Sequence, residues 1–179
     1  MKRLQTHFLF FLLFYDLTSF GQSNKSKDYL LLFTDTTKDE SGYKNQLGDT
    51  VIKLGKYNIC FTDTFRTYAI VADKSFGFVA IDRQQSILYK VFPFNNGPDY
   101  VADGLFRIII NNKIGYADEA TGNIIIKPHF DCAFPFKNGV AKVGLNCTTH
   151  DTGEHHYWTS KNWLYIDKKG RKVKLPDSK

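Results

Sequence analysis

The chain has 179 residues, a formal net charge of +6 at pH 7 and a high aromatic content, with 16 Phe and 10 Tyr. This length suits one domain with a substantial core, and the aromatic enrichment favours strands over helices. Three Cys are too few for a disulfide scaffold, and the basic charge is dense only at residues 168–174, where a solvated hairpin end is expected.

The N-terminal segment has the three parts of a secretory signal peptide. Residues 1–3 are positively charged, residues 8–15 form an uninterrupted apolar run, and Ser19 and Gly21 place small residues before a cut. An eight-residue run is too short to span a bilayer, which needs about 20 residues. We therefore expect a signal peptide at 1–21 and a protein exported through the secretory pathway. The mature chain should lie in the periplasm or outside the cell, with no membrane span and no nucleic-acid partner.

The mature chain begins with a polar tether at residues 22–28, and a β-repeat domain is expected over 29–179. Its three cysteines are Cys60, Cys132 and Cys147. An odd number in an exported chain allows at most one intramolecular disulfide. The sequence leaves open all three pairings as well as three free thiols.

Residues 112–145 form the clearest repeat unit. A short strand at 114–117 contains Gly115, which permits a close approach or a bend, and a Gly turn follows it. The return strand is expected at 124–126 and should end at Pro128, because proline cannot continue a hydrogen-bond ladder. A loop with apolar side chains and a third alternating strand complete the unit.

The same scheme recurs with lower fidelity elsewhere in the chain. We place about four units at 41–71, 76–108, 112–145 and 160–176, with an insertion at 146–159. With Gly42, Gly77, Gly115 and Leu164 taken as equivalent, the units start 35, 38 and 49 residues apart. The insertion explains the longest interval. The turn-rich segment 95–104 is interpreted as a surface loop.

This pattern resembles the WG repeat, whose signature is roughly Lys-Trp-Gly-Tyr-Ile-Asp, a Gly turn, two branched apolar residues, Pro, an aromatic-Asp pair, and then Phe, Gly and Val. The matching positions are Lys113, Gly115, Tyr116, Asp118, Gly122, Ile125, Ile126, Pro128, Phe130, Asp131, Phe136, Gly139, Ala141 and Val143. The signature Trp is present only in the last copy, as Trp163. Ser41, Phe76 and Ile114 stand in its place in the others.

The resemblance implies a bacterial repeat protein, often exported, built of short antiparallel strands and without shared catalytic residues. One hairpin cannot bury an apolar face alone, so the units must stack. The expected fold class is all-β: an array of short antiparallel hairpin repeats, open and meander- or solenoid-like, with a closed propeller-like ring as the alternative.

The insertion at 146–159 carries the residues that the repeat does not explain. Its thiol and imidazoles are the types that bind transition metals, and its aromatic pair is the type that anchors partners. The candidate metal ligands are Cys147, His150, His155 and His156, and the candidate partner-binding residues are Tyr157 and Trp158. In a hairpin, His150 and His155 could meet across the turn. A polar loop with exposed histidines remains the third interpretation.

No motif in the sequence indicates catalysis. A phosphate-binding Gly loop, a serine nucleophile elbow and a zinc-protease helix motif are all missing from it, and the aspartates at 63, 82, 118 and 167 are expected to cap turns. We therefore expect no enzyme and no cofactor other than a possible transition metal. The favoured function is a binding or structural module that contacts a protein or glycan in the cell envelope; the alternative is metal binding by the insertion at 147–156.

Overall fold

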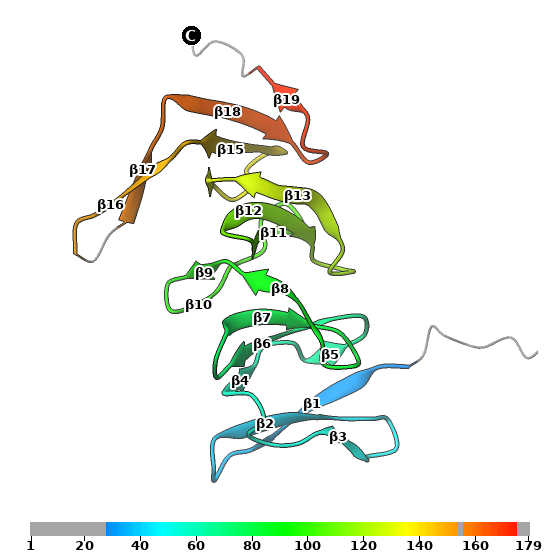
Figure 1. Ribbon diagram of the computed structural model, residues 1–179. Helices are drawn as coiled ribbons and strands as arrows, with labels where there is room; N and C mark the ends of the chain where they lie inside the picture. Colours follow the sequence, from blue (N-terminus) through cyan, green and yellow to red (C-terminus); the bar gives the residue numbers. More distant parts are fainter. Residues whose placement is uncertain (1–27, 154–155, 175–179) are drawn as a thin grey trace, which may run out of the picture.

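The computed structural model describes residues 28–153 and 156–174 (Figure 1). The proposed signal peptide and residues 22–27 of the tether lie outside these residues. The described chain is all-β, as expected, and none of its residues forms a helix that could cross a membrane. Its strands are β1 (Leu30–Asp35), β2 (Glu40–Lys44), β3 (Thr50–Ile52), β4 (Ile59–Cys60), β5 (Thr64–Phe65), β6 (Ala69–Asp73), β7 (Gly77–Ile81), β8 (Ile87–Val91), β9 (Pro93–Phe94), β10 (Gly97–Pro98), β11 (Leu105–Ile110), β12 (Lys113–Asp118), β13 (Ile124–Phe130), β14 (Cys132–Ala133), β15 (Val140–Leu145), β16 (Thr148–Asp151), β17 (His156–Thr159), β18 (Asn162–Asp167) and β19 (Lys172–Val173).

Four antiparallel three-stranded meanders follow one another along the chain. They are β1–β2–β3, β6–β7–β8, β11–β12–β13 and β15–β18–β19. The second and third join in one seven-stranded sheet through the pairing of β8 with β11. Figure 1 shows the units stacked, with β2 and β3 at one end and β18 and β19 at the other, and the described strands of these two end units share no sheet. The described array is therefore open, and the ring alternative does not apply to it.

The core is divided into three clusters, each built from neighbouring units. Tyr43 of the first unit packs in one cluster with Val79 of the second. The second unit shares another cluster with the third, and Tyr116 of the third lies in the same cluster as Ile166 of the last. Each unit thus buries its apolar face against the next, which is the energetic reason for stacking.

Strand register defines which residues of the units are equivalent. The corresponding pairs between middle and third strands are Tyr43–Ile52, Ala80–Tyr89, Tyr116–Ile126 and Tyr165–Val173. By this register Val79 is equivalent to Gly115, so the predicted equivalence of Gly77 was wrong. Phe78, and not Phe76, likewise occupies the position of the signature Trp. Equivalent positions, from Gly42 to Val79, to Gly115 and to Leu164, then lie 37, 36 and 49 residues apart.

Gly115 is required by a close approach of the neighbouring strand. The register of β12 on β13 shifts here, and a Cβ built on Gly115 would lie 2.4 Å from the carbonyl oxygen of Ile126 and 2.6 Å from the nitrogen of Pro128. Pro128 therefore lies inside β13 at a bulge, where no N–H is needed, and the prediction that it ends the strand was wrong. The same approach recurs at Gly42, whose added Cβ would lie 2.5 Å from the Ile52 oxygen.

The tyrosine that follows each of these glycines is a buried cross-link. The Tyr43 hydroxyl donates to the Thr62 carbonyl at 2.8 Å, and the Tyr116 hydroxyl donates to the Phe134 carbonyl at 2.7 Å. Burial raises the pKa of both hydroxyls well above the ordinary value for tyrosine. Each hydroxyl joins the middle strand of its unit to the segment that leads into the next unit.

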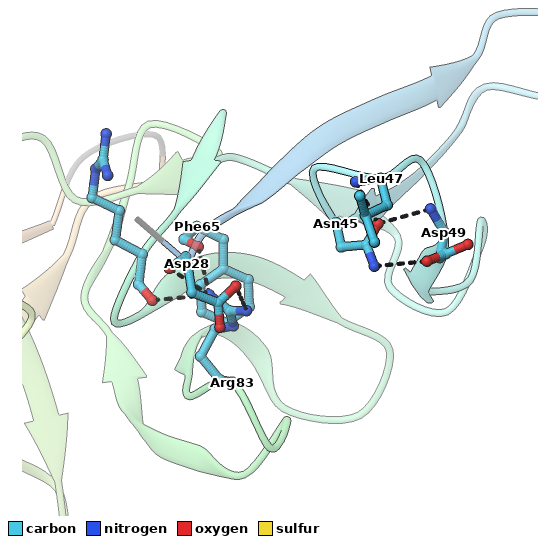
Figure 2. A network of polar contacts seen from close by, with 7 residues as sticks. Asp28, Asn45, Leu47, Asp49, Phe65 and Arg83 are labelled. Atoms are coloured by element: carbon cyan, nitrogen blue, oxygen red, sulfur yellow. Dashed lines mark hydrogen bonds and ion pairs between the residues drawn. The ribbon is translucent and has the colours of Figure 1, made fainter. Parts of the chain in front are cut away.

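Polar side chains close the turns and brace the start of the array. Asn45 accepts hydrogen bonds from the backbone N–H groups of Leu47 and Asp49. Of the four aspartates predicted to cap turns, Asp82, Asp118 and Asp167 do so in the same way. Figure 2 shows this Asn45 turn and the Arg83 guanidinium, which pairs with Asp28 at 3.1 Å and also donates to its carbonyl. Arg83 thereby ties Asp28, two residues before β1, to the second unit.

A buried ion pair holds the segment 95–104, which was expected to be a surface loop. Asp99 is only 6% exposed, and its carboxylate accepts hydrogen bonds from the backbone N–H and the Nε of Arg107 at 2.8 and 2.9 Å. Arg107 also donates to the carbonyl of Ala133, and its guanidinium lies over the Phe92 ring at 4.1 Å. The segment is therefore anchored in the array by a fully paired charge.

Candidate functional site

The insertion at 146–159 forms a β-hairpin of its own, which we call the insertion hairpin. Its strands β16 and β17 pair only with each other among the described strands, in register from Thr148–Thr159 to Asp151–His156. The ribbon projects from the side of the stack, at the left in Figure 1. It is the part of the described chain that departs most from the repeat.

A disulfide between Cys132 and Cys147 holds the base of the insertion hairpin. Their Cα atoms are 6.0 Å apart, and Cys132 is fully buried on β14. A Cβ on Gly144, which is paired with Cys132 across the sheet, would lie 2.7 Å from either sulfur, so only glycine leaves room for the bridge. Cys60 is a buried free thiol. Of the alternatives that the sequence left open, the structure has this one pairing.

The disulfide corrects the proposed metal site. Cys147 was wrong as a ligand, because a disulfide sulfur is not the thiolate that binds metals. A meeting of His150 and His155 across the turn was one possibility, but Tyr157 is the cross-strand partner of His150. His155 and the side chain of His156 lie outside the described residues, and within those residues no three metal-binding side chains converge.

The inner face of the insertion hairpin packs on the array through Trp158. Its indole meets the Phe92 ring edge to face at 5.9 Å and the Phe134 ring at 5.5 Å. Phe134 also contacts Trp163, and the Lys142 ammonium lies 4.3 Å from the Trp163 ring centre. Trp158, predicted as a partner-binding residue, is thus half-buried and engaged within the chain itself.

The outer face presents Tyr157 to solvent. Tyr157 is 51% exposed, and its ring stacks on the ring of His150 with centroids 4.9 Å apart. His150 Nε2 lies 2.8 Å from the hydroxyl of Thr159. Alternation along β16 and β17 therefore separates a structural aromatic on one face from an exposed, prepositioned aromatic on the other.

A polar hollow lies at the base of the insertion hairpin, where it joins β15 and β18. Its lining consists of amide, hydroxyl and ammonium side chains: Asn146, Thr148, Thr159, Ser160, Lys161 and Asn162. Lys161 forms no ion pair with any described residue. No carboxylate, imidazole or thiol belongs to this set, so the hollow offers hydrogen bonds and one positive charge.

The sequence interpretation did not single out the hollow. It named the titratable and aromatic residues of the insertion, whereas the lining residues are ordinary polar types that are common in loops. The only available signal was the alternation of the predicted hairpin, which places Thr148 and Thr159 on one face. That signal becomes usable only when the register is known.

Comparison with known families agrees with this geometry. The family model described as WG containing repeat matches residues 114–146. This segment is therefore similar to a WG repeat. The matched segment begins in β12, includes the bulge opposite Gly115 and the Tyr116 cross-link, and ends at Asn146 on the rim of the polar hollow. No curated protein and no solved structure showed significant similarity to the chain.

The WG-repeat match confirms the expectation for this segment, and the register explains its signature in physical terms. The Gly of the motif admits the bulged strand, and the Tyr after it binds a carbonyl in the segment beyond the third strand. The Asp closes the turn between the middle and third strands. The insertion hairpin follows directly after the WG repeat and is specific to this chain's last unit.

Proposed function

We propose that this WG-repeat protein is an exported, non-enzymatic binding module that uses the insertion hairpin to contact a protein or glycan of the cell envelope. One observation carries the proposal: the hairpin is held firmly at its base and inner face, yet its outer face keeps Tyr157 half exposed. A prepositioned aromatic loses little freedom on binding, and tyrosine is enriched among the residues that dominate binding energy.

Repeat architecture supports the same role. In stacked arrays the units supply a stable scaffold, and insertions on one side of the stack commonly form the binding face. Here the insertion hairpin lies outside the sheets of the four units, so the residues of its outer face can vary without loss of the core.

Export is supported by two independent features. Residues 1–21 have the pattern of a signal peptide, and the Cys132–Cys147 disulfide is of the kind that persists in oxidising compartments such as the periplasm. Fractionation of cells that express the full chain tests this directly. Recovery of uncleaved protein in the cytoplasm would contradict the proposal.

The binding role is tested by capture from envelope extracts and on immobilised envelope glycans. The Tyr157→Ala variant should capture at least about tenfold less partner than the unchanged protein, since a hot-spot aromatic contributes about 2 kcal/mol or more. Tyr100→Ala is the matched control, because Tyr100 is equally exposed at 48% but lies outside the insertion hairpin. Equal capture by both variants would overturn the assignment of the surface.

A further inference from the structure

We propose that the polar hollow at the base of the insertion hairpin is a subsite for a sugar residue that carries a carboxylate. Lys161 would pair with the carboxylate, and the threonine and asparagine side chains would bind the ring hydroxyls. The inference rests on the proposed function, in that it names the ligand class of the same hairpin. The proposed function depends on Tyr157, whereas the subsite depends on the residues that line the hollow.

The chemistry of the lining favours a glycan over a protein. The buried centre of a protein interface is apolar and depleted of charged residues. The hollow instead combines two amides, three hydroxyls and one ammonium, with no large apolar side chain among them. Hydroxyl and amide groups both donate and accept hydrogen bonds, which matches the alternating hydroxyls of a pyranose ring.

The charge favours an acidic sugar, and a carboxylate in particular. Lys161 forms no ion pair with any described residue, and no carboxylate lines the hollow. One ammonium balances the single charge of a carboxylate. A phosphate dianion would call for a second cation or a forked arginine, and neither is present in the lining.

The walls of the hollow are prepositioned by contacts within the chain. Ser160 donates from its hydroxyl to the Leu145 carbonyl at 2.6 Å and accepts from the backbone N–H of Asn162 at 2.9 Å. The backbone N–H of Asn146 donates to Asp131 at 2.6 Å, and the disulfide at Cys147 fixes the adjacent residue. The backbone around the hollow is therefore fixed before a ligand binds, which limits the ordering cost to side chains and helps to preserve affinity.

Tyr157 extends the site beyond one sugar residue. Its ring stacks on His150, which bonds to Thr159 in the wall of the hollow, so the three side chains form one continuous strip on the outer face. An exposed aromatic ring offers an apolar face to the C–H groups of a second pyranose. The expected ligand is thus a short acidic oligosaccharide and not a free monosaccharide.

The test measures binding of defined sugars to the full exported chain by calorimetry and by NMR chemical-shift changes. The probes are a galacturonic acid trimer, its methyl ester and a phosphorylated glucose oligomer of equal length. The acidic trimer should bind at least tenfold more tightly than its ester, with shifts at Thr148, Thr159 and Asn162. Lys161→Met should remove this preference.

Two further variants separate a specific subsite from general attraction to a basic protein. Asn162→Asp places a carboxylate in the hollow and should weaken binding of the trimer at least tenfold, while Lys169→Met, in the exposed basic run, should change it less than twofold. Circular dichroism and melting temperature establish that each variant is folded. An unchanged affinity in Lys161→Met, or equal binding of the ester, overturns the proposal. Tighter binding of the phosphorylated oligomer overturns the assignment of the carboxylate.

The outcome is distinguishable from failure of the proposed function. If the unchanged protein captures an envelope partner in a Tyr157-dependent way but binds none of the sugars, the carboxylate subsite is wrong and the contact surface stands. If the trimer binds the hollow but nothing is captured through Tyr157, the subsite stands and the wider contact surface is wrong.

Discussion

The regular units and the insertion hairpin are stabilised in different ways. In the units, buried tyrosines such as Tyr43 and Tyr116 bind carbonyl groups further along the chain, and each core cluster spans two neighbours. The insertion hairpin pairs only with itself among the described strands, and its attachment depends on one disulfide and one indole, that of Trp158.

This difference suggests a division of roles, in which the array provides stability and the insertion hairpin provides recognition. The array distributes its stability over successive interfaces, so a change inside a unit should lower the stability of the fold. The hairpin adds little to that core, so changes on its outer face should alter binding while the fold is retained. The following predictions test this division, from the largest expected effect to the smallest.

Loss of the buried ion pair should lower the stability of the array more than any other single substitution proposed here. Arg107→Met removes the partner of the buried Asp99 carboxylate and should lower the free energy of unfolding by about 3–5 kcal/mol, because an uncompensated charge remains inside. Denaturant titration measures the loss. Arg171→Met, which removes an exposed pair with Asp167, should cost no more than about 1 kcal/mol. Equal losses would contradict the role given to the buried pair.

The disulfide should stabilise the insertion hairpin and its junction. The double variant Cys132→Ser, Cys147→Ser opens a loop closed by residues 15 apart and should lose about 3 kcal/mol. A reductant should lower the melting temperature of the unchanged protein and leave the double variant unaffected. Cys60→Ser, at the free thiol, should still respond to the reductant. If the double variant also responded, another bridge would have to account for it.

The close approach at the WG glycine should be sensitive to a single methyl group. Gly115→Ala places a Cβ within 2.4 Å of a backbone oxygen and should cost about 1–3 kcal/mol of stability, since backbone atoms on both sides must shift. Gly97→Ala is the control, because its Cβ would meet its nearest neighbour at an ordinary 3.7 Å; its effect should stay within about 0.5 kcal/mol. Similar melting temperatures for the two variants would show that the bulge is not a constraint.

The tyrosine cross-link should have a smaller effect at neutral pH. Tyr116→Phe removes one buried hydrogen bond and should cost about 1 kcal/mol, whereas Tyr157→Phe, on the exposed outer face, should change stability by less than about 0.5 kcal/mol. Thermal unfolding of the two variants measures the difference. A larger loss of stability in Tyr157→Phe would show that the outer face of the hairpin stabilises the fold, against its assignment to binding.

The buried tyrosine hydroxyls of the array predict a loss of stability in alkali. Burial raises the pKa of Tyr68 to about 12 and raises those of Tyr43, Tyr89 and Tyr116 as well. Because the unfolded chain ionises first, at about pH 10, this stabilisation is complete below that pH and declines as the pH rises toward the folded pKa values. Tyrosinate absorbance and circular dichroism should change together above pH 10. If all tyrosines ionised near pH 10 while the protein stayed folded, these hydroxyls would not be buried as described.

The all-β class and the unit at 112–145 could be predicted from local pattern alone. Strand alternation, the Gly turn and the turn aspartates act over a few residues, and the close approach at Gly115 was among the alternatives named. The equivalence of Gly77 and the end of the strand at Pro128 were wrong. Both depend on register, which the partner strand sets.

The candidate site was predicted in position but not in composition. Departure from the repeat interval located the insertion, and its aromatic pair was named, although Trp158 proved to face inward. Cys147 was assigned to a metal, and its pairing with Cys132 depends on two Cβ atoms that face each other across a fold the sequence does not display. The polar hollow arises from residues on three strands and connecting segments.

The sequence by itself determined the repeat, its period of about 36 residues and the place where that period is broken, because each unit's turns and strands follow from local residue types. Only the tertiary structure decided which face of each strand is buried, which cysteines are joined and which side of the insertion hairpin meets solvent. These depend on contacts between residues far apart in the chain, and in an array such contacts exist only after the neighbouring unit has packed in place.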